Sequence, residues 1–404
     1  SAGTSNFRAG VNAGNSIESG GNYNTVVGDE AGTAITTGDN NVAVGYAALD
    51  ANTTANSNTA VGKEALGANT TGAANTAVGK DALYANTTGA SNVAVGVSAL
   101  AANTTASNNT AVGRDALVAN TTGINNVAVG SLAGDANTTG SYNTVMGQNV
   151  LGVNTTGSEN TAIGWDALKA NTTASFNVAV GTTALGLNTT GANNTALGAY
   201  ALDSNTTADN NTAVGRSALG LNTTGSVNVA VGAEALLTNT TGASNTAVGY
   251  QSLKLATTAS NNTSMGYRAL RTTTTGASNV AVGSSALYSN TTGYENIAIG
   301  VNAMYTNTTG GENTANGYYA LYTNNAVGNT AMGRVALQYN TTGANNTAVG
   351  GAALRANTTA DNNTAVGHNA LNVNTTGTRN SAMGSNALDA NTEGNYNSAF
   401  GYNS

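Results

Sequence analysis

The chain has no cysteine, no proline and a single histidine among its 404 residues. Without cysteine, no disulfide can hold the fold together. Without proline, collagen is excluded, because a collagen chain needs abundant proline and glycine at every third position. The only histidine, His368, occupies a position that varies between repeats. We therefore predict neither a histidine metal cluster nor a Ser-His-Asp triad.

Charge and long apolar runs are also scarce. Only 8% of the residues are charged, the net charge is −7, and the 12 lysines and arginines do not cluster in the sequence. A basic stripe that follows a phosphate backbone is therefore not expected, and neither is a nucleic-acid partner. No apolar run approaches the roughly 20 residues needed to span a bilayer. Disorder is not expected either, because 40% of the residues are hydrophobic and follow a regular pattern.

A pentapeptide of the type Asn-Thr-Ala-Val-Gly recurs every 17 residues along the chain. The first copy is residues 24–28 and the last is residues 397–401, with one step of 16 between Asn313 and Asn329. This gives 23 copies. A fixed period of this length indicates one supersecondary unit stacked on itself. We expect a repetitive segment over residues 24–404, preceded by a degenerate N-terminal segment, residues 1–23, that forms a possible junction.

The repeat is numbered here from its asparagine, with residues 58–74 as the reference copy. Positions 2–4 and positions 8–11 each predict a short strand, and Asn-Thr-Thr-Gly at positions 12–15 predicts a turn. A helical repeat would need longer units. The sequence therefore predicts an all-β fold, a parallel β-solenoid of about 23 coils. At about 4.8 Å per coil, such a rod would be near 110 Å long.

Apolar residues at positions 4 and 9 are the predicted core. Position 4 is occupied by Val61 and its counterparts, and position 9 is leucine in most coils, as in Leu66. Position 2 alternates between threonine and valine and is expected on the same face as position 4. The asparagine at position 1 is expected to form a ladder in which amides bond from coil to coil.

Position 3 is alanine in nearly every copy, although it faces away from positions 2 and 4. A face restricted to alanine suggests close approach by another surface, so we predict an interface between chains. The alternative is tight packing of these alanines inside a single coil. The interface residues of the first hypothesis are Ala60, Ala77, Ala94, Ala111, Ala128 and Ala179.

The repeats resemble the head repeats of YadA-like trimeric autotransporter adhesins. Residues 41–45 (Asn-Val-Ala-Val-Gly) and 296–300 (Asn-Ile-Ala-Ile-Gly) are close to that family's first strand. The family's usual period is 14 residues, so this chain would be a 17-residue variant, similar also to fibre segments of phage tails and large bacterial surface proteins. The resemblance implies a left-handed parallel β-roll, with three chains side by side.

Few residues have a pattern that suggests chemistry. Glu64, Asp81 and Asp115 share position 7, but Ser98 interrupts that row, and carboxylate pairs of the glycosidase kind are not indicated. We expect no enzymatic activity, cofactor or metal. The Asn-Thr-Thr turns match the N-glycosylation pattern, although turn chemistry also produces this match. The matching residues include Asn52, Asn69, Asn86, Asn120 and Asn137.

Tyrosine is concentrated between residues 250 and 339, and Tyr288, Tyr305 and Tyr322 occupy position 10 in successive coils. This row is a candidate contact for a glycan or another fibre; alternatively, it only supports neighbouring coils. The irregular coil at 313–328 places Asn316 at position 4, which is predicted to weaken packing there.

These observations predict an extracellular or cell-surface structural fibre or adhesin, homotrimeric, that displays variable residues on a long rod. The last coil stops at Ser404 without a capping segment, so the ends are expected to join head to tail into a filament. The alternative is a monomeric, soluble binding solenoid that recognises ice or a glycan. Ice binding is not favoured, because position 4 is a predicted core site and leaves no flat row of exposed threonines.

Overall fold

The structure, a computed structural model, describes residues 3–404, which contain 24 β-strands and no helix. The chain divides into two compact units, Ser1–Tyr200 and Ala201–Ser404. The strands of the first unit are β1 (Phe7–Ala9), β2 (Thr25–Val27), β3 (Val42–Val44), β4 (Thr59–Val61), β5 (Thr76–Val78), β6 (Val93–Val95), β7 (Thr110–Val112), β8 (Val127–Val129), β9 (Thr144–Met146), β10 (Thr161–Ile163), β11 (Val178–Val180) and β12 (Thr195–Leu197). Those of the second unit are β13 (Thr212–Val214), β14 (Val229–Val231), β15 (Thr246–Val248), β16 (Thr263–Met265), β17 (Val280–Val282), β18 (Ile297–Ile299), β19 (Thr314–Asn316), β20 (Thr330–Met332), β21 (Thr347–Val349), β22 (Thr364–Val366), β23 (Ser381–Met383) and β24 (Ser398–Phe400).

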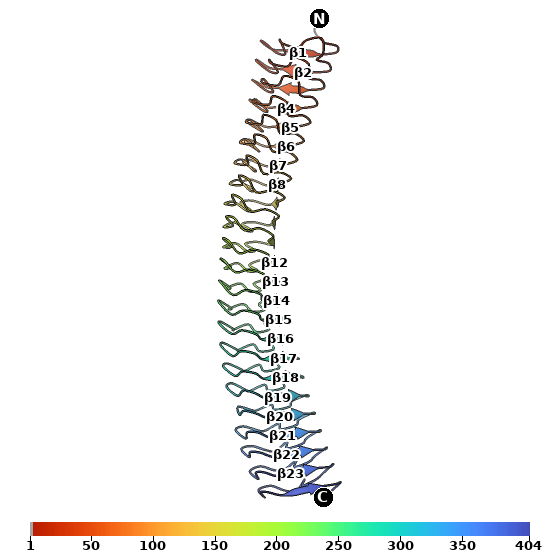
Figure 1. Cartoon of the computed structure of the whole chain (residues 1–404), viewed down its shortest axis with the longest axis vertical. Coiled ribbons are helices and arrows are strands. Elements are labelled where there is room, and N and C mark those ends of the chain that lie inside the picture. Colours follow the sequence, from red (N-terminus) through yellow and green to blue (C-terminus); the bar gives the residue numbers. More distant parts are fainter. Residues whose placement is uncertain (1–2) are drawn as a thin grey trace. The chain divides into compact units, whose positions relative to one another are not determined.

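Within each unit, every strand pairs in parallel with the strand of the next coil. The register is one to one, so that Ala60 lies opposite Ala77, and Ala77 lies opposite Ala94. In each unit the coils follow one another in chain order, with their strands on one side (Figure 1). The predicted parallel β-solenoid with a 17-residue period is therefore confirmed.

The inward-facing residue of each strand is position 3. Ala60 is fully buried, whereas Thr59 and Val61 on either side of it are only partly buried. The prediction that position 4 is the main core site is therefore wrong, while the prediction for Leu66 at position 9 is confirmed, because that leucine is fully buried. Position 3 is a small residue in most coils, where leucine occupies the interior from the opposite wall, although Val145 and Leu151 are both buried in a single coil.

The coil at residues 24–40 shows this compensation directly. Here position 3 is Val26, and position 9 is Gly32 rather than leucine. A Cβ atom added to Gly32 would lie 3.2 Å from Cγ1 of Val26. Cδ1 of Ile35, which stands at position 12 of this coil in place of asparagine, would be closer still at 2.8 Å, so the isoleucine and the valine together occupy space that a leucine fills elsewhere.

Positions 8–11 do not form the predicted second strand. The backbone enters the left-handed region at Glu64, directly before this segment (φ of 56°), and again within it at Leu66 (φ of 52°), so an extended strand cannot form there. These turns still bond along the axis, because the amide of Leu66 donates to the carbonyl of Ala82 (3.0 Å) and that of Ala68 to Tyr84 (3.0 Å). The wall opposite the strands is therefore a stack of turns rather than a second sheet.

Glycine at position 5 is required by the close approach of successive coils. Gly62 has a φ of +139°, and a Cβ atom at this residue would lie 2.5 Å from the carbonyl oxygen of Gly79. No other residue fits both the backbone conformation and this contact.

Two ladders of buried asparagines run through the coils. At position 1, the backbone N–H of Asn58 donates to the side-chain Oδ1 of Asn41 (3.0 Å), which confirms the predicted ladder. At position 12, Nδ2 of Asn86 donates to Oδ1 of Asn69 (2.8 Å) and to the carbonyl of Gly89 (2.9 Å). This second ladder was not predicted, since these asparagines were assigned to a turn. Both ladders satisfy polar groups that burial would otherwise leave unpaired.

The position-12 ladder is interrupted in the second unit. The residue after Asn239 in this row is Ala256, and Oδ1 of Asn239 is buried without a hydrogen-bond partner. Oδ1 of Asn307, just before the 16-residue coil, is also buried without a partner. The position-1 ladder continues across the 16-residue coil, because the backbone N–H of Asn329 donates to Oδ1 of Asn313 (2.9 Å).

Two further sequence-based predictions, on Asn316 and on the N-terminal segment, differ from the structure. Asn316 lies on the exposed face of β19 rather than in the core, so the reason given for weak packing at that residue is wrong. The segment predicted as a degenerate junction, residues 1–23, contains β1, which pairs with β2 through Phe7 and Thr25. It therefore folds as a further coil from residue 3 onward; residues 1 and 2 lie outside the described residues.

Candidate functional surfaces

The six alanines predicted at an interface are all inside the coils. Their exposed fraction is 0%. The neighbouring coil and the leucine wall of the same chain cover them, so the interface hypothesis does not fit their position, and the alternative of tight packing within a coil does. These residues are Ala60, Ala77, Ala94, Ala111, Ala128 and Ala179.

The outward face of the strands carries positions 2 and 4, and we call it the strand face. From β2 to β23 it contains no charged side chain, and position 4 is apolar in every strand except at Asn316. Several of its large apolar side chains are more than a third exposed, including Val78, Val95, Met146, Leu197, Ile297 and Met332. The chain thus has an apolar row that nothing in the described structure covers.

The predicted tyrosine row forms a stack. The ring centroids of Tyr288 and Tyr305 are 5.1 Å apart with planes 8° from parallel, and those of Tyr305 and Tyr322 are 5.4 Å apart at 7°. Burial, with smaller effects from Tyr319 and Tyr305, raises the pKa of Tyr322. Because the rings cover one another's faces, they leave mainly their edges for contact, which suits bracing of adjacent coils better than stacking against a sugar.

The asparagines of the glycosylation pattern belong to the buried position-12 ladder. Nδ2 of Asn69 donates to Oδ1 of Asn52 (3.2 Å) and to the carbonyl of Gly72 (3.0 Å). An attached sugar would have to replace these bonds and enter the interior. Of the five sites named from the sequence, Asn52, Asn69, Asn86 and Asn120 are 0% exposed and Asn137 is 1% exposed. The folded coils therefore do not present these amides for modification.

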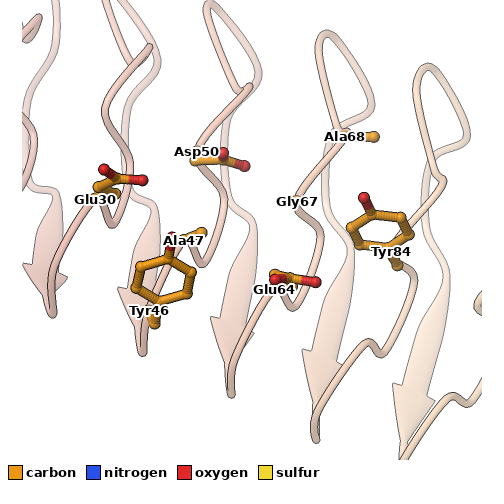
Figure 2. Close-up of a pocket in the computed structure, with 8 residues that line it drawn as sticks. All are labelled: Glu30, Tyr46, Ala47, Asp50, Glu64, Gly67, Ala68 and Tyr84. Carbon is orange, nitrogen blue, oxygen red and sulfur yellow. The ribbon is translucent and has the colours of Figure 1, made fainter.

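An acidic cleft lies on the side of the first unit. Figure 2 shows Asp50 and Glu64 between the rings of Tyr46 and Tyr84, with Glu30 on the preceding coil beyond Tyr46; these residues line a cavity of about 260 Å³. Burial raises the pKa of Asp50, and repulsion from Glu30 and Glu64 adds to this effect. Sequence reasoning grouped Glu64 with the acids of its own row instead, because it did not foresee that positions 7 and 10 of neighbouring coils lie together.

Within residues 3–404, no three histidine, cysteine, aspartate or glutamate side chains are arranged to hold a metal ion. Asp81, from the position-7 row, instead forms an ion pair with Lys80 (3.1 Å), and Asp115 forms one with Arg114 (2.7 Å). His368 lies exposed at position 6, as its place in the repeat predicts.

A cluster of basic residues forms on the side of the second unit, around Glu234. Its carboxylate accepts from Arg216 (2.9 Å), from Lys254 (2.8 Å) and from Nε2 of Gln251 (2.9 Å). The bond from Lys254, followed by that from Gln251, lowers the pKa of Glu234 to about 2. Basic residues that are dispersed in the sequence therefore gather in space here, because the coiling brings them together; the inference from their spacing that they would stay apart is wrong for this region.

Comparison with protein-family models and with curated proteins finds no match for this sequence. Within the described residues, no helix is long and apolar enough to cross a membrane.

Proposed function

We propose that this chain is a structural module of an extracellular fibre, in which copies of the chain lie side by side and join through the strand face. The observation that carries this proposal is the uncovered strand face, with threonine or valine at position 2 in most strands and an almost unbroken apolar row at position 4. Homotrimeric assembly and an adhesive role follow the resemblance to trimeric adhesin heads. The side surfaces at positions 6, 7 and 10 would then face outward and contact other molecules.

The size of the strand face supports this assembly. A three-residue strand is about 10 Å long and strands are spaced by about 4.8 Å, which gives about 50 Å² of sheet per coil. The 24 strands therefore offer about 1,200 Å² per chain. A stable protein interface of standard size needs about 800 Å² per partner. The strand face alone provides enough area for such an interface.

Ice binding is the second candidate, because the threonines at position 2 point outward together with position 4. This arrangement removes the objection that position 4 is buried. Position 4, however, changes among Val231, Met265 and Ile299 while staying apolar. An apolar interface tolerates such changes by repacking, whereas a surface that matches a crystal lattice needs a constant shape. The variation favours a protein partner.

The native mass, measured by size-exclusion chromatography with light scattering, tests the proposal. We expect a multiple of the 39.6 kDa chain mass. The double variant Val78→Glu with Val95→Glu should lower that mass and leave the circular dichroism spectrum unchanged, because both side chains lie on the strand face.

The matched control is Ala77→Glu with Ala94→Glu, one residue earlier in the same strands. These substitutions place charge inside the coil and should unfold it. A monomeric wild-type chain would refute side-by-side assembly. A monomer that also inhibits ice recrystallisation would support the second candidate.

A further inference from the structure

Gln251 holds two arginines side by side in the second unit. Its side chain is only 6% exposed, and its Oε1 accepts from Nε of Arg268 (3.1 Å) and from Nε of Arg271 (3.2 Å). Because both bonds end on one oxygen, the two guanidinium groups are neighbours. Nε2 of Gln251 is fixed by its bond to Glu234 (2.9 Å), which sets the orientation of the amide.

No carboxylate neutralises this arginine pair. Both oxygens of Glu234 already accept from Arg216, Lys254 and Gln251. The sequence from 235 to 294 contains no aspartate or glutamate. Two cations held close together without a counter-ion repel each other, and an anion bound between them would relieve that repulsion.

The arginines retain hydrogen-bond donors for such an anion. Arg271 uses Nη1 to donate to the Tyr288 hydroxyl (3.1 Å), and Nη2 has no partner in the described chain. The Arg268 guanidinium lies over the ring of Tyr267, with its carbon 4.9 Å from the centroid, and neither of its Nη atoms has a partner there. Arginine presents such donors in a planar fork that matches carboxylate and sulfate groups.

We propose that Gln251, Arg268 and Arg271 form an oxyanion site that binds a sulfate or carboxylate group of an acidic glycan. The site lies on the side surface, apart from the strand face, and only its role in adhesion rests on the proposed function. A nucleic acid is a poorer ligand, because the chain carries a net charge of −7 and no basic stripe extends beyond this cluster. The tyrosines position the arginines rather than stacking on the sugar, since Tyr250 and Tyr267 stack on each other at 5.7 Å.

The chain contains a matched control with a single arginine. Nε of Arg355 donates to Oε1 of Gln338 (3.0 Å), and its guanidinium carbon lies 5.5 Å from the centroid of the Tyr339 ring. Arg355, Gln338 and Tyr339 thus make the same kinds of contact as the residues of the proposed site, but no second arginine shares the glutamine oxygen. If paired guanidinium groups are what bind the anion, Arg355 should contribute little.

Binding of the full chain to immobilised dextran sulfate, to an oxidised, carboxylate-bearing dextran and to uncharged dextran tests the site. We expect binding to at least one acidic polymer and none to uncharged dextran. Arg268→Gln and Arg271→Gln should each weaken binding by about tenfold or more, and Arg355→Gln should leave it unchanged. Arg271→Lys, which keeps the charge but loses the fork, should weaken binding partially.

Inorganic sulfate and duplex DNA are the competing probes. Free sulfate should displace the polymer only at a concentration well above that of the polymer's own anionic groups, because a single ion lacks the multivalency of the polymer. Equal losses in Arg268→Gln and Arg355→Gln, or tighter binding to DNA than to either acidic dextran, would overturn the proposal. Each variant is also measured for native mass and circular dichroism, so a failure of side-by-side assembly is distinguished from a failure of this site.

Discussion

The leucines at position 9 combine a buried side chain with a backbone conformation that side chains usually avoid. Leu83 has a φ of 52° and is fully buried. The left-handed conformation costs roughly 1–2 kcal/mol, and burial of a leucine contributes about 1.5–3 kcal/mol. Gly32 and Gly134 occupy the same position with φ of 55° and 60°, without strain but also without a core side chain. Burial therefore explains why leucine predominates at a position where the backbone favours glycine.

Ala256 interrupts the position-12 ladder, and asparagine at this residue should restore it. The new Nδ2 would donate to Oδ1 of Asn239, which is buried without a partner. We expect Ala256→Asn to raise the free energy of unfolding by about 1 kcal/mol, as measured by urea denaturation. The same substitution at Ala259, which is buried but outside the ladder, should destabilise. Stabilisation by both substitutions, or by neither, would contradict this explanation.

Asp50 should make the first unit more stable on mild acidification. Its folded pKa is raised, so its ionised form is disfavoured in the folded state. Stability is therefore lost as pH rises from the unfolded pKa through the folded pKa, and is regained as pH falls. Asp50→Asn should stabilise the protein at pH 7 by less than about 1 kcal/mol, because solvent screens this partly exposed group. Thermal melts of both proteins at pH 7 and pH 3 should differ at pH 7 only.

Glu234 should have the opposite pH dependence. Its folded pKa of about 2 lies below the ordinary value of 4.5, so its ionised form stabilises the folded state. That contribution is present above pH 4.5 and is lost as pH falls toward about 2. Glu234→Gln should be less stable than the wild type at pH 7, and the difference should shrink steadily as pH falls and be small at pH 2. A constant difference in melting temperature across this range would show that packing, not charge, is lost.

At the scale of elements, the 17-residue period fixes much of the fold. Repetition of Asn, Gly and short β-branched segments predicts the parallel strands, their register and the position-1 ladder, because identical coils stack with identical neighbours. The inward face of β4 could not be predicted in the same way. Alternation shows that Thr59 and Val61 share a face, but not which face is inside. Here the narrow coil, rather than hydrophobicity, selects Ala60.

The turns that follow each strand show a second limit of sequence reasoning. Ala-Leu-x-Ala has the spacing of a strand, and only the left-handed φ angles at Glu64 and Leu66 distinguish the turns from it. The arginine pair and the acidic cleft were missed for a related reason. The cleft acids lie one or more coils apart, and the two arginines of one coil are joined only through Gln251 of the coil before it. Positions 7 and 10 become neighbours only in this turn conformation.

Amide exchange should be fastest where the position-12 ladder is interrupted. Missing ladder bonds remove local stability, and exchange reports local opening. We expect faster exchange in residues 239–256 and 307–328 than in residues 75–120, where the ladder is continuous from Asn86 to Asn120. Mass spectrometry after deuterium labelling, with peptides resolved by coil, measures this. Uniform protection across these three segments would show that the ladder contributes little.

At the scale of the whole molecule, each coil depends on its immediate neighbours. Strand contacts within each unit connect only consecutive strands. Stability is then approximately the sum of coil and nearest-neighbour contributions. Folding of one coil therefore requires contacts with its neighbouring coils but not with distant parts of the chain.

A disruptive core substitution should therefore have a local effect. Ala111→Glu introduces a charge into the interior of the first unit and should remove exchange protection from the coils on either side of β7. Protection in residues 340–380, in the second unit, should remain. Loss of protection in both units at once would indicate a single cooperative transition instead.

The asparagine ladders also bear on how such a gene can change. Each coil offers the next one the same amide donor and carbonyl acceptor, so any regular coil can follow any other. Unequal recombination that adds or removes 51 base pairs, three for each of 17 residues, would leave these bonds intact. The 16-residue coil shows that even an imperfect event is tolerated, because the Asn329 amide still reaches Asn313. The number of coils can therefore vary in a lineage with little penalty to folding, and it can change faster than the residues within each coil.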